Sequence, residues 1–223
     1  MGGCALCEKG YVAMKKITVF VFRNNRKELL LFEHEDKTVQ LPAGTVEINE
    51  GLLKAGIREA CEETAISQDS IISGELLDFS NNDLENDELV IEKTSPVFSR
   101  PKETSMNWGK IPRGITVKQV QESGGFYQVY YDDWNDEIKK DYLTYSLLGW
   151  IKKEHASKEK LRYYCVLDVK NEQEEWLVNN DNHEFKPFWS PITNLPKNIV
   201  PENKWINILR AYLKKNSTTK VVT

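Results

Sequence analysis

The chain has 223 residues, of which 40% are hydrophobic and 29% are charged, and its formal net charge is −4. This balance excludes global disorder and allows a packed core. A pI near 5.6 argues against the broad basic surface that extended nucleic acids require. The sequence has no apolar run of about 18 residues, as a membrane span would need, and no apolar signal-peptide stretch at its start. We expect a cytoplasmic enzyme or binding protein with a small ligand.

The cysteines divide into two groups. Cys4 and Cys7 form a C-x-x-C pair, which is half of a zinc site, but no second pair follows at zinc-ribbon spacing. We interpret residues 1–13 as a flexible tail, and zinc binding by the pair stays open. Cys61 and Cys165 lie in apolar contexts and are predicted to be buried, reduced thiols.

Apolar runs and turn residues predict the elements that precede residue 80. In chain order these are a strand at 15–23, a hairpin turn at NNRK, a strand at 28–33, an extended segment at VQLPAGTVE, a helix over about 49–65 and a strand near 74–79. Pro42 and Gly44 are expected to shape the backbone before the helix.

Residues 81–142 differ in character and are predicted to be a β-rich insertion of irregular structure. Polar and Gly-rich stretches interrupt it, with strand candidates at 116–121 and 125–131. Regular strands then return at 143–152, 161–169 and 185–189, and a last helix follows Pro201. We expect one domain over residues 14–217, and a frayed tail at 218–223.

The helix at 49–65 carries an unusual charge pattern. At 100° per residue, Glu59, Glu62 and Glu63 fall on one side, where like charges cost a few tenths of a kcal/mol. The opposite, core-facing stripe consists of Leu53, Ile57, Ala60, Cys61 and Thr64. Ala55 and Gly56 edge the acidic side, and we interpret them as clearance for an approaching ligand. An ordinary solvated helix face is the alternative.

A hard divalent cation would reverse the repulsion, because Mg²⁺ and Mn²⁺ prefer carboxylate oxygens and keep water ligands. Phosphate oxygens suit the remaining coordination positions. Arg58 can pair with Glu62 at i+4 or with Glu50 before the helix, and can so hold a ligand carboxylate in one rotamer.

The whole stretch GTVEINEGLLKAGIREACEETAI, residues 44–66, resembles the Nudix box, G-x5-E-x7-R-E-U-x-E-E-x-G-U, in which U is a bulky aliphatic residue. The matching positions are Gly44, Glu50, Arg58, Glu59, Glu62, Glu63 and Ile66. Ala65 replaces the usual Gly, and Ala60 is smaller than the usual aliphatic residue. The Gly position favours a left-handed helix end, which Ala adopts at a cost of about 1 kcal/mol.

The resemblance implies an α/β/α sandwich around a mixed sheet. It also implies that water attacks phosphorus to hydrolyse a nucleoside diphosphate linked to another moiety. Carried over by position, Glu59, Glu62, Glu63 and the Gly44 carbonyl would bind Mg²⁺ or Mn²⁺. Arg58 would orient Glu59, and Glu50 would support the loop or contact the metal through water. The expected partner is a small nucleotide diphosphate derivative, with no extended nucleic acid and no membrane; homodimer formation stays open.

Other roles stay open. The general base is either a box glutamate or a distant acid, for which the candidates are Glu154, Glu174, Glu175 and Glu184. His34, Lys110 and Arg113 are candidates for substrate contact, against the alternatives of a surface hairpin and solvated loop charges. The insertion shapes either the mouth of the pocket or a dimer surface. A Nudix-fold nucleotide-binding or regulatory protein without catalysis is the alternative function, although its usual mark, a broken glutamate set, is not seen.

Overall fold

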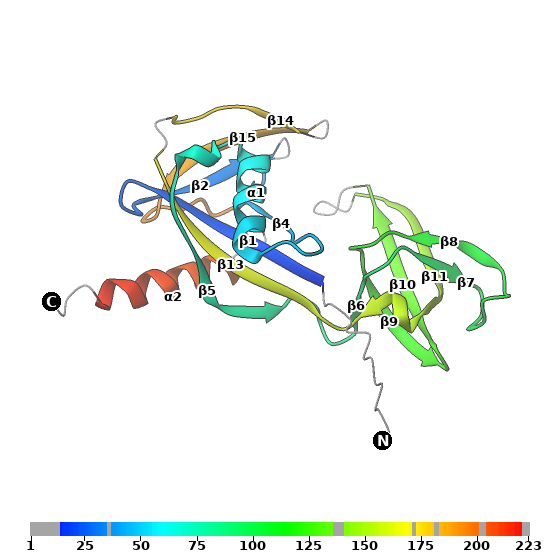
Figure 1. Ribbon diagram of the computed structural model, residues 1–223. Coiled ribbons are helices and arrows are strands. Elements are labelled where there is room, and N and C mark those ends of the chain that lie inside the picture. The colour runs from blue at the N-terminus through cyan, green and yellow to red at the C-terminus, as the bar shows by residue number, and fades with distance from the viewer. Residues whose placement is uncertain are drawn as a thin grey trace, which may run out of the picture. The chain divides into compact units, whose positions relative to one another are not determined.

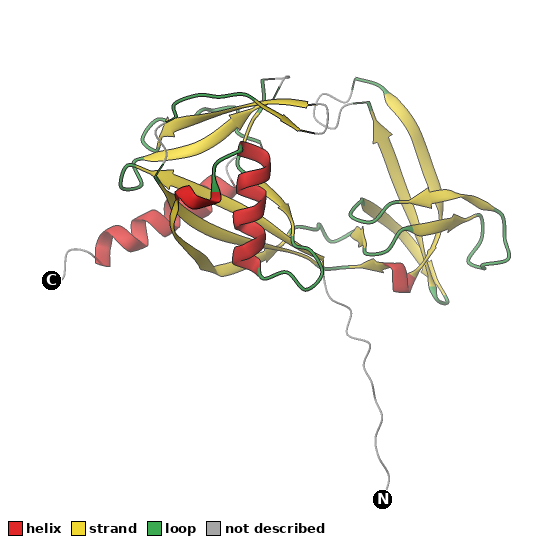
Figure 2. Ribbon diagram, turned by 45° about the horizontal axis from the view of Figure 1, so that its top comes forward, coloured by secondary structure: helices red, strands yellow, loops and turns green. Residues whose placement is uncertain are grey.

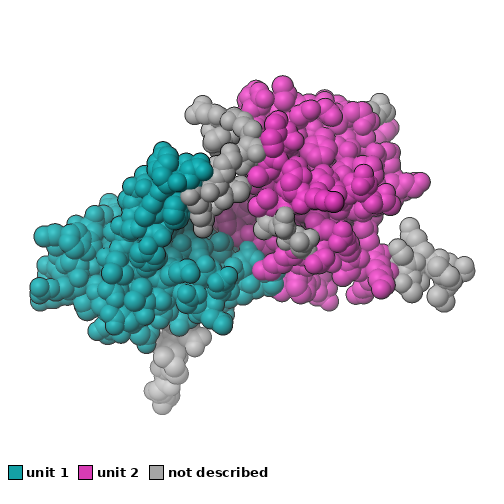
Figure 3. All heavy atoms as spheres, turned by 180° about the vertical axis from the view of Figure 1, so that it is seen from behind, with its two compact units in different colours: residues 1–15, 81–161 teal, residues 16–80, 162–223 magenta. Residues whose placement is uncertain are grey.

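The computed structural model describes residues 14–34, 37–135, 141–170, 173–180, 183–200 and 204–219. The predicted tail at 1–13, with Cys4 and Cys7, and residues 220–223 lie outside this set. The chain forms two compact units (Figure 3). The main unit contains residues 16–80 and 162–223, and the inserted unit contains residues 81–161 together with 1–15.

The main unit is built on an eight-stranded sheet with the order β14-β15-β2-β1-β13-β5, in which β3 pairs with β2 and β4 pairs with β1 (Figure 1). Its strands are β1 (Met14–Arg23), β2 (Glu28–Glu33), β3 (Val39–Gln40), β4 (Ala43–Thr45), β5 (Ile71–Asn82), β13 (Lys160–Val169), β14 (Val178–Asn180) and β15 (His183–Pro191). The β1–β2 and β2–β15 ladders are antiparallel, whereas Val39 forms a parallel bridge with Ile199, so the sheet is mixed.

The two helices cover opposite faces of this sheet (Figure 2). They are α1 (Leu52–Thr64) and α2 (Lys204–Thr219), and the short 3-10 helix η1 (Gln68–Ser70) follows α1. Along β1 successive side chains alternate between the faces. Val19 and Val21 pack in the core cluster that contains Ala60 of α1, whereas Phe20 packs in the cluster that contains Leu209 of α2. This arrangement confirms the predicted α/β/α sandwich.

The inserted unit has its own seven-stranded sheet, with the order β12-β6-β9-β10-β11-β7-β8. Its elements are β6 (Glu88–Ile91), β7 (Ser95–Phe98), β8 (Asn107–Ile111), β9 (Thr116–Ser123), β10 (Phe126–Trp134), β11 (Leu143–Lys152), the 3-10 helix η2 (Lys153–His155) and β12 (Ala156–Ser157). Leu89, Val129 and Ile151 belong to a separate core cluster. The unit extends to Leu161 rather than to the expected residue 142, because β11 pairs with β10 instead of joining the main sheet.

The chain leaves and rejoins the main sheet at neighbouring strands. The backbone N–H of Asp83 donates to the carbonyl of Lys160 at 2.9 Å, and that of Lys170 donates to Ser70 at 2.8 Å. β5 and β13 are therefore antiparallel neighbours, and the insertion emerges from their adjacent ends. Neither α1 nor α2 is long and apolar enough to cross a membrane.

Candidate active site

The box folds as a strand, a loop and a helix on β1. Gly44 of β4 lies opposite Ile17 of β1, and the loop from Val46 to Gly51 leads into α1. At the other end of the helix, Ala65 takes the left-handed conformation, with φ of 53°, and its N–H donates to the carbonyl of Cys61 at 2.8 Å. The helix therefore ends as a glycine would end it, although the residue is Ala.

Arg58 forms hydrogen bonds with three of the box glutamates. Its Nε and Nη2 donate to Glu50 Oε1 and Oε2 at 3.0 and 2.9 Å, and its Nη1 donates to Glu59 Oε1 and Glu62 Oε2, both at 2.9 Å. Nη2 also donates to the carbonyl of Thr45 at 2.9 Å. The hydrogen bonds to Glu50 are the main reason that the pKa of Arg58 is raised above its usual value. The two pairings considered from the sequence, with Glu50 and with Glu62, thus occur together.

Glu50 also shapes the loop. Its Oε2 accepts a hydrogen bond from the backbone N–H of Glu47 at 3.0 Å. The hydrogen bonds from Arg58 hold the pKa of Glu50 below its usual value, although burial opposes them. This carboxylate is therefore ionised and fixed at neutral pH, and it ties the loop to the helix.

Gly44 makes room for the carboxylate of Glu59. A Cβ atom at position 44 would lie 1.9–2.1 Å from the carboxylate atoms of Glu59. This distance is shorter than any van der Waals contact, so the carboxylate would have to move. Glu59 itself is buried, and burial raises its pKa although the adjacent Arg58 lowers it. The box thus needs Gly at position 44 for steric reasons, whether or not its carbonyl binds metal.

Glu63 is the acid whose pKa is most clearly displaced. Its Oε2 accepts a hydrogen bond from the backbone N–H of Ala43 at 2.9 Å. Burial raises the pKa of Glu63 to about 8, against this hydrogen bond, and the charges of Glu59 and Glu62 raise it further. Burial is therefore the main reason that the Glu63 carboxyl group ionises less readily than a solvated one.

The carboxylate donors of the box suit a hard cation that keeps part of its water shell, and they do not form a closed metal cage. Within the described ranges, no three acidic, His or Cys side chains converge as a ready metal site. Mg²⁺ is usually held by one or two carboxylates, with water and phosphate oxygens completing its shell, so a preformed cage is not required. Burial is the main cause of the raised pKa values of Glu59 and Glu63, and repulsion by the neighbouring carboxylates adds to it, so a bound cation would favour their ionised forms.

The family model of the NUDIX domain matches residues 14–108, a range that contains β1 to β5 and the whole box. This match identifies residues 14–108 as a Nudix domain. No curated protein matches it. The match ends inside the inserted unit, and the last strands and the second helix of the Nudix sandwich follow that unit in the chain.

The small residues of the Nudix helix face the sheet, so their interpretation as clearance for a ligand was wrong. A Cβ at Gly56 would lie 2.4 Å from Cys165 Sγ, and Ala55 is fully buried. Leu53 and Ile57, predicted to face the core, are only partly buried at its edge. The helix is rotated so that its smallest side chains meet the sheet and allow close packing.

The two Cys residues of the Nudix unit are free, and Cys165 is buried as predicted, while Cys61 is partly buried. Burial raises the pKa of the Cys165 thiol to about 12, so the thiol is protonated at neutral pH. It serves as a packing residue beneath the box helix.

His34 lies half-buried at the start of the β2–β3 hairpin, where its backbone bonds to Thr38 and Lys37, and its ring joins an aromatic cluster. Its ring is 5.2 Å from that of Phe32 and 4.8 Å from that of Phe185, between centroids. Within the described part of the chain, its buried Nε2 has no hydrogen-bond partner. The structure records no contact of His34 with a described box residue, so its role in substrate binding stays a prediction.

The distant acids divide between the two units. Glu174 and Glu175 are exposed and form ion pairs with Arg23 at 2.7 Å and with Lys186 at 2.8 Å. Glu184 is exposed on β15. Glu154, like Lys110 and Arg113, belongs to the inserted unit. No described contact selects one of these acids as the general base.

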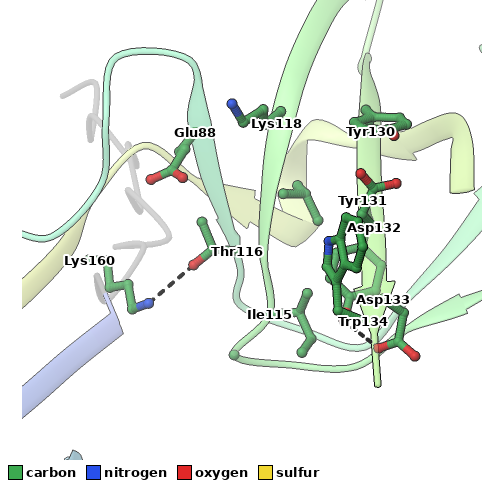
Figure 4. A pocket seen from close by; sticks show the side chains of 12 residues that line it. Glu88, Ile115, Thr116, Lys118, Tyr130, Tyr131, Asp132, Asp133, Trp134 and Lys160 are labelled. Carbon is green, nitrogen blue, oxygen red and sulfur yellow. Dashed lines mark hydrogen bonds between the residues drawn. The ribbon is translucent and has the colours of Figure 1, made fainter. Parts of the chain in front are cut away.

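A cavity of about 520 Å³ lies within the inserted unit, between β9 and the end of β10 (Figure 4). None of the predicted site residues lines it. Several of its polar groups already have partners: Lys160 donates to Thr116 at 3.1 Å, and Tyr131 donates to Asp133 at 3.0 Å. A ligand would have to compete with these contacts, and the cavity is separate from the Nudix box.

Sequence reasoning missed Lys16. This residue lies opposite Thr45 in the β1–β4 ladder, and its Nζ donates to Thr45 Oγ1 at 2.6 Å. Burial is the main influence on the pKa values of Glu59 and Glu63, and the positive charge of Lys16 opposes it in both. No local sequence pattern indicates this contact, because the pairing of β1 with β4 brings together residues that are 29 positions apart.

Proposed function

We propose that this protein is a divalent-cation-dependent hydrolase that cleaves a phosphoanhydride bond in a nucleoside diphosphate linked to another moiety. A Nudix domain supports pyrophosphohydrolase-type activity in general. The observation that carries the proposal for this chain is the complete acidic set arranged around Arg58, with Glu50, Glu59 and Glu62 all bonded to it.

In this proposal Glu59, Glu62, Glu63 and the carbonyl of Gly44 hold Mg²⁺ or Mn²⁺. The bound cation would supply Lewis-acid stabilisation of negative charge on a phosphoryl oxygen. Arg58 fixes the rotamer of Glu59 through the 2.9 Å hydrogen bond, and Glu50 holds Arg58 in place. Burial of Glu59 keeps bulk water from its carboxylate, which strengthens its attraction to a cation.

The reaction class requires water to attack phosphorus, and a carboxylate is expected to accept the proton. The general base stays a choice between a box glutamate and the distant candidates Glu154, Glu174, Glu175 and Glu184. A cytoplasmic location and a homodimer also stay predictions.

The test is a substrate panel of ADP-ribose, sugar nucleotides, nucleoside di- and triphosphates, dinucleoside polyphosphates, NADH and coenzyme A, with Mg²⁺, with Mn²⁺ or with EDTA. We expect turnover of at least one compound with Mg²⁺ and none with EDTA. Glu62→Gln should lower kcat/KM by at least about 100-fold, since it removes a charged metal ligand. Glu47→Gln is the matched control, because Glu47 is exposed in the loop before the same helix.

No turnover of any compound with either metal would contradict the proposal, as would full activity of Glu62→Gln. Thermal stabilisation by a nucleotide without product would favour the alternative, a nucleotide-binding or regulatory protein.

A further inference from the structure

Arg58, although it is the most prominent cation of the Nudix site, has no donor left for a substrate. A guanidinium carries five N–H donors. Its five hydrogen bonds in this structure go to Glu50, Glu59, Glu62 and the carbonyl of Thr45. Arg58 is therefore committed to organising the carboxylates, and a side-chain cation that binds the diphosphate beside the metal must be another residue.

Lys16 is the cation placed for that purpose. It lies opposite Thr45 in the β1–β4 ladder, one position before the Ile17–Gly44 pair, and its side chain points to the other face of β1 from that of Ile17. Its Nζ is held by the hydroxyl of Thr45 at 2.6 Å. The carbonyl of Thr45 in turn accepts from Arg58 at 2.9 Å, so the lysine is anchored to the same loop as the box arginine.

The charge of Lys16 acts on both Glu59, which is buried, and Glu63, which is partly buried. Three carboxylates and a diphosphate together carry more negative charge than one divalent cation offsets, so a further positive charge beside them lowers their repulsion. An ammonium has three donors and can bridge a carboxylate, a hydroxyl and a phosphoryl oxygen at once. Such a bridge would join the acidic cluster to an anionic substrate.

We propose that Lys16 binds a nonbridging phosphoryl oxygen of the diphosphate substrate, with Thr45 holding the lysine in position. This inference rests on the proposed function of the same site. It assigns substrate binding to a residue outside the Nudix box.

The experiment compares Lys16→Met and Lys16→Arg with the control Lys15→Met, whose side chain lies on the other face of β1. With the substrate found in the panel, Lys16→Met should raise KM about 10- to 100-fold, the range expected when a charge-assisted hydrogen bond is lost. Its kcat should change less than its KM. Lys16→Arg should restore most of the affinity, and Lys15→Met should behave as wild type.

Mg²⁺ affinity, measured by calorimetry on the substrate-free protein, separates binding of phosphate from support of the metal ligands. We expect Lys16→Met to leave it within about threefold of wild type, less than the loss that a direct ligand would cause. A fall in Mg²⁺ affinity with unchanged KM would overturn the proposal, as would identical kinetics of Lys16→Met and Lys15→Met. Circular dichroism checks that each variant is folded, and Lys16→Gln, which removes the charge but keeps a polar side chain, serves as the test with the same expected rise in KM if Lys16→Met is not.

Failure of the proposed function can be recognised separately. If wild-type protein turns over nothing, calorimetry with Mg²⁺ and α,β-methylene-ADP, a nonhydrolysable diphosphate, tests Lys16 alone. Binding by wild type that weakens at least about tenfold in Lys16→Met supports the inference. Equal binding by both proteins, or no binding by wild type, overturns it.

Discussion

At the scale of single residues, Gly44 is the position of the Nudix site where an added side chain has the least space. Its missing side chain leaves the space that the carboxylate of Glu59 fills, and Arg58 holds that carboxylate from the other side. The backbone of β4 and the side chain of α1 are thus in direct contact. A methyl group at position 44 would displace Glu59 without removing any ligand atom.

We therefore expect Gly44→Ala to lower Mg²⁺ affinity about 10- to 100-fold, the usual effect of misplacing a metal ligand through its surroundings. Calorimetric titration with Mg²⁺ measures it. Gly51→Ala is the matched control, because a Cβ at position 51 meets no atom within 4 Å. Unchanged Mg²⁺ affinity in Gly44→Ala would show that Glu59 does not bind the metal.

The backbone conformation of Ala65 affects the stability of the protein. Its left-handed conformation, with φ of 53°, costs an L-residue about 1 kcal/mol relative to Gly. Ala65→Gly should therefore stabilise the protein by up to about 1 kcal/mol, which raises Tm by about 2–4 °C in a protein of this size. Differential scanning calorimetry measures the shift. Ala60→Gly, within the helix, should instead destabilise, and a lower Tm for Ala65→Gly would contradict the assigned helix end.

At the scale of elements, an ion-pair network joins four parts of the main unit. Arg26, in the β1–β2 turn, donates to both carboxylate oxygens of Asp168 on β13, at 2.8 and 2.6 Å. Ser73 of β5 also donates to Asp168, at 3.0 Å, and Tyr212 of α2 contacts Arg26 and Glu75. This network pins the turn, the sheet edge and the second helix together.

The network makes stability depend on pH. Burial raises the pKa of Asp168, but the hydrogen bonds from Arg26 and Ser73 outweigh it, so the folded pKa lies below the ordinary value. A depressed carboxylate pKa contributes stability above the unfolded pKa, about 3.9, and this contribution is lost as the pH falls through the folded pKa. The stabilisation is thus complete at pH 7 and declines under acidic conditions.

Asp168→Asn should cost about 1–2 kcal/mol in the free energy of unfolding at pH 7, and less at pH 3. Urea denaturation at the two pH values measures both costs. Asp78→Asn, at an exposed position of β5, is the control and should cost little at either pH. An equal cost of Asp168→Asn at both pH values would exclude the ion pair as its cause.

Local sequence patterns predicted the helices and strands better than they predicted how these elements pair and pack. The helix at residues 52–64 and its arginine pairs were readable, because i to i+4 neighbours are fixed by helical geometry. The sheet to which β11 belongs could not be predicted, because the apolar pattern of a strand does not indicate which sheet it joins. The rotation of α1 onto Gly56, and the place of Lys16 beside Thr45, also depend on tertiary packing.

At the scale of the whole molecule, two units with separate cores share one chain. The described core clusters of the main unit draw only on that unit, and the cluster of the inserted unit draws only on residues between β6 and β12. The two chain connections lie together, because Asn82 accepts from the backbone of Lys160 at 2.9 Å. The main sheet does not need the inserted residues to complete its strands.

Replacing residues 83–159 with Asn-Gly should therefore leave the Nudix unit folded. Antiparallel neighbours such as β5 and β13 can be joined by a two-residue turn, and Asn-Gly favours the turn type that such hairpins use. We expect cooperative thermal unfolding and the Mg²⁺ affinity of the full chain.

A Gly-Ser-Gly-Ser connection is the control that separates a strained turn from the loss of the unit. Binding of the dye ANS and no cooperative transition in both variants would show that the inserted unit is required for folding. A raised KM with unchanged Mg²⁺ affinity would instead assign the inserted unit a part in substrate binding, because the proposed metal ligands all belong to the main unit.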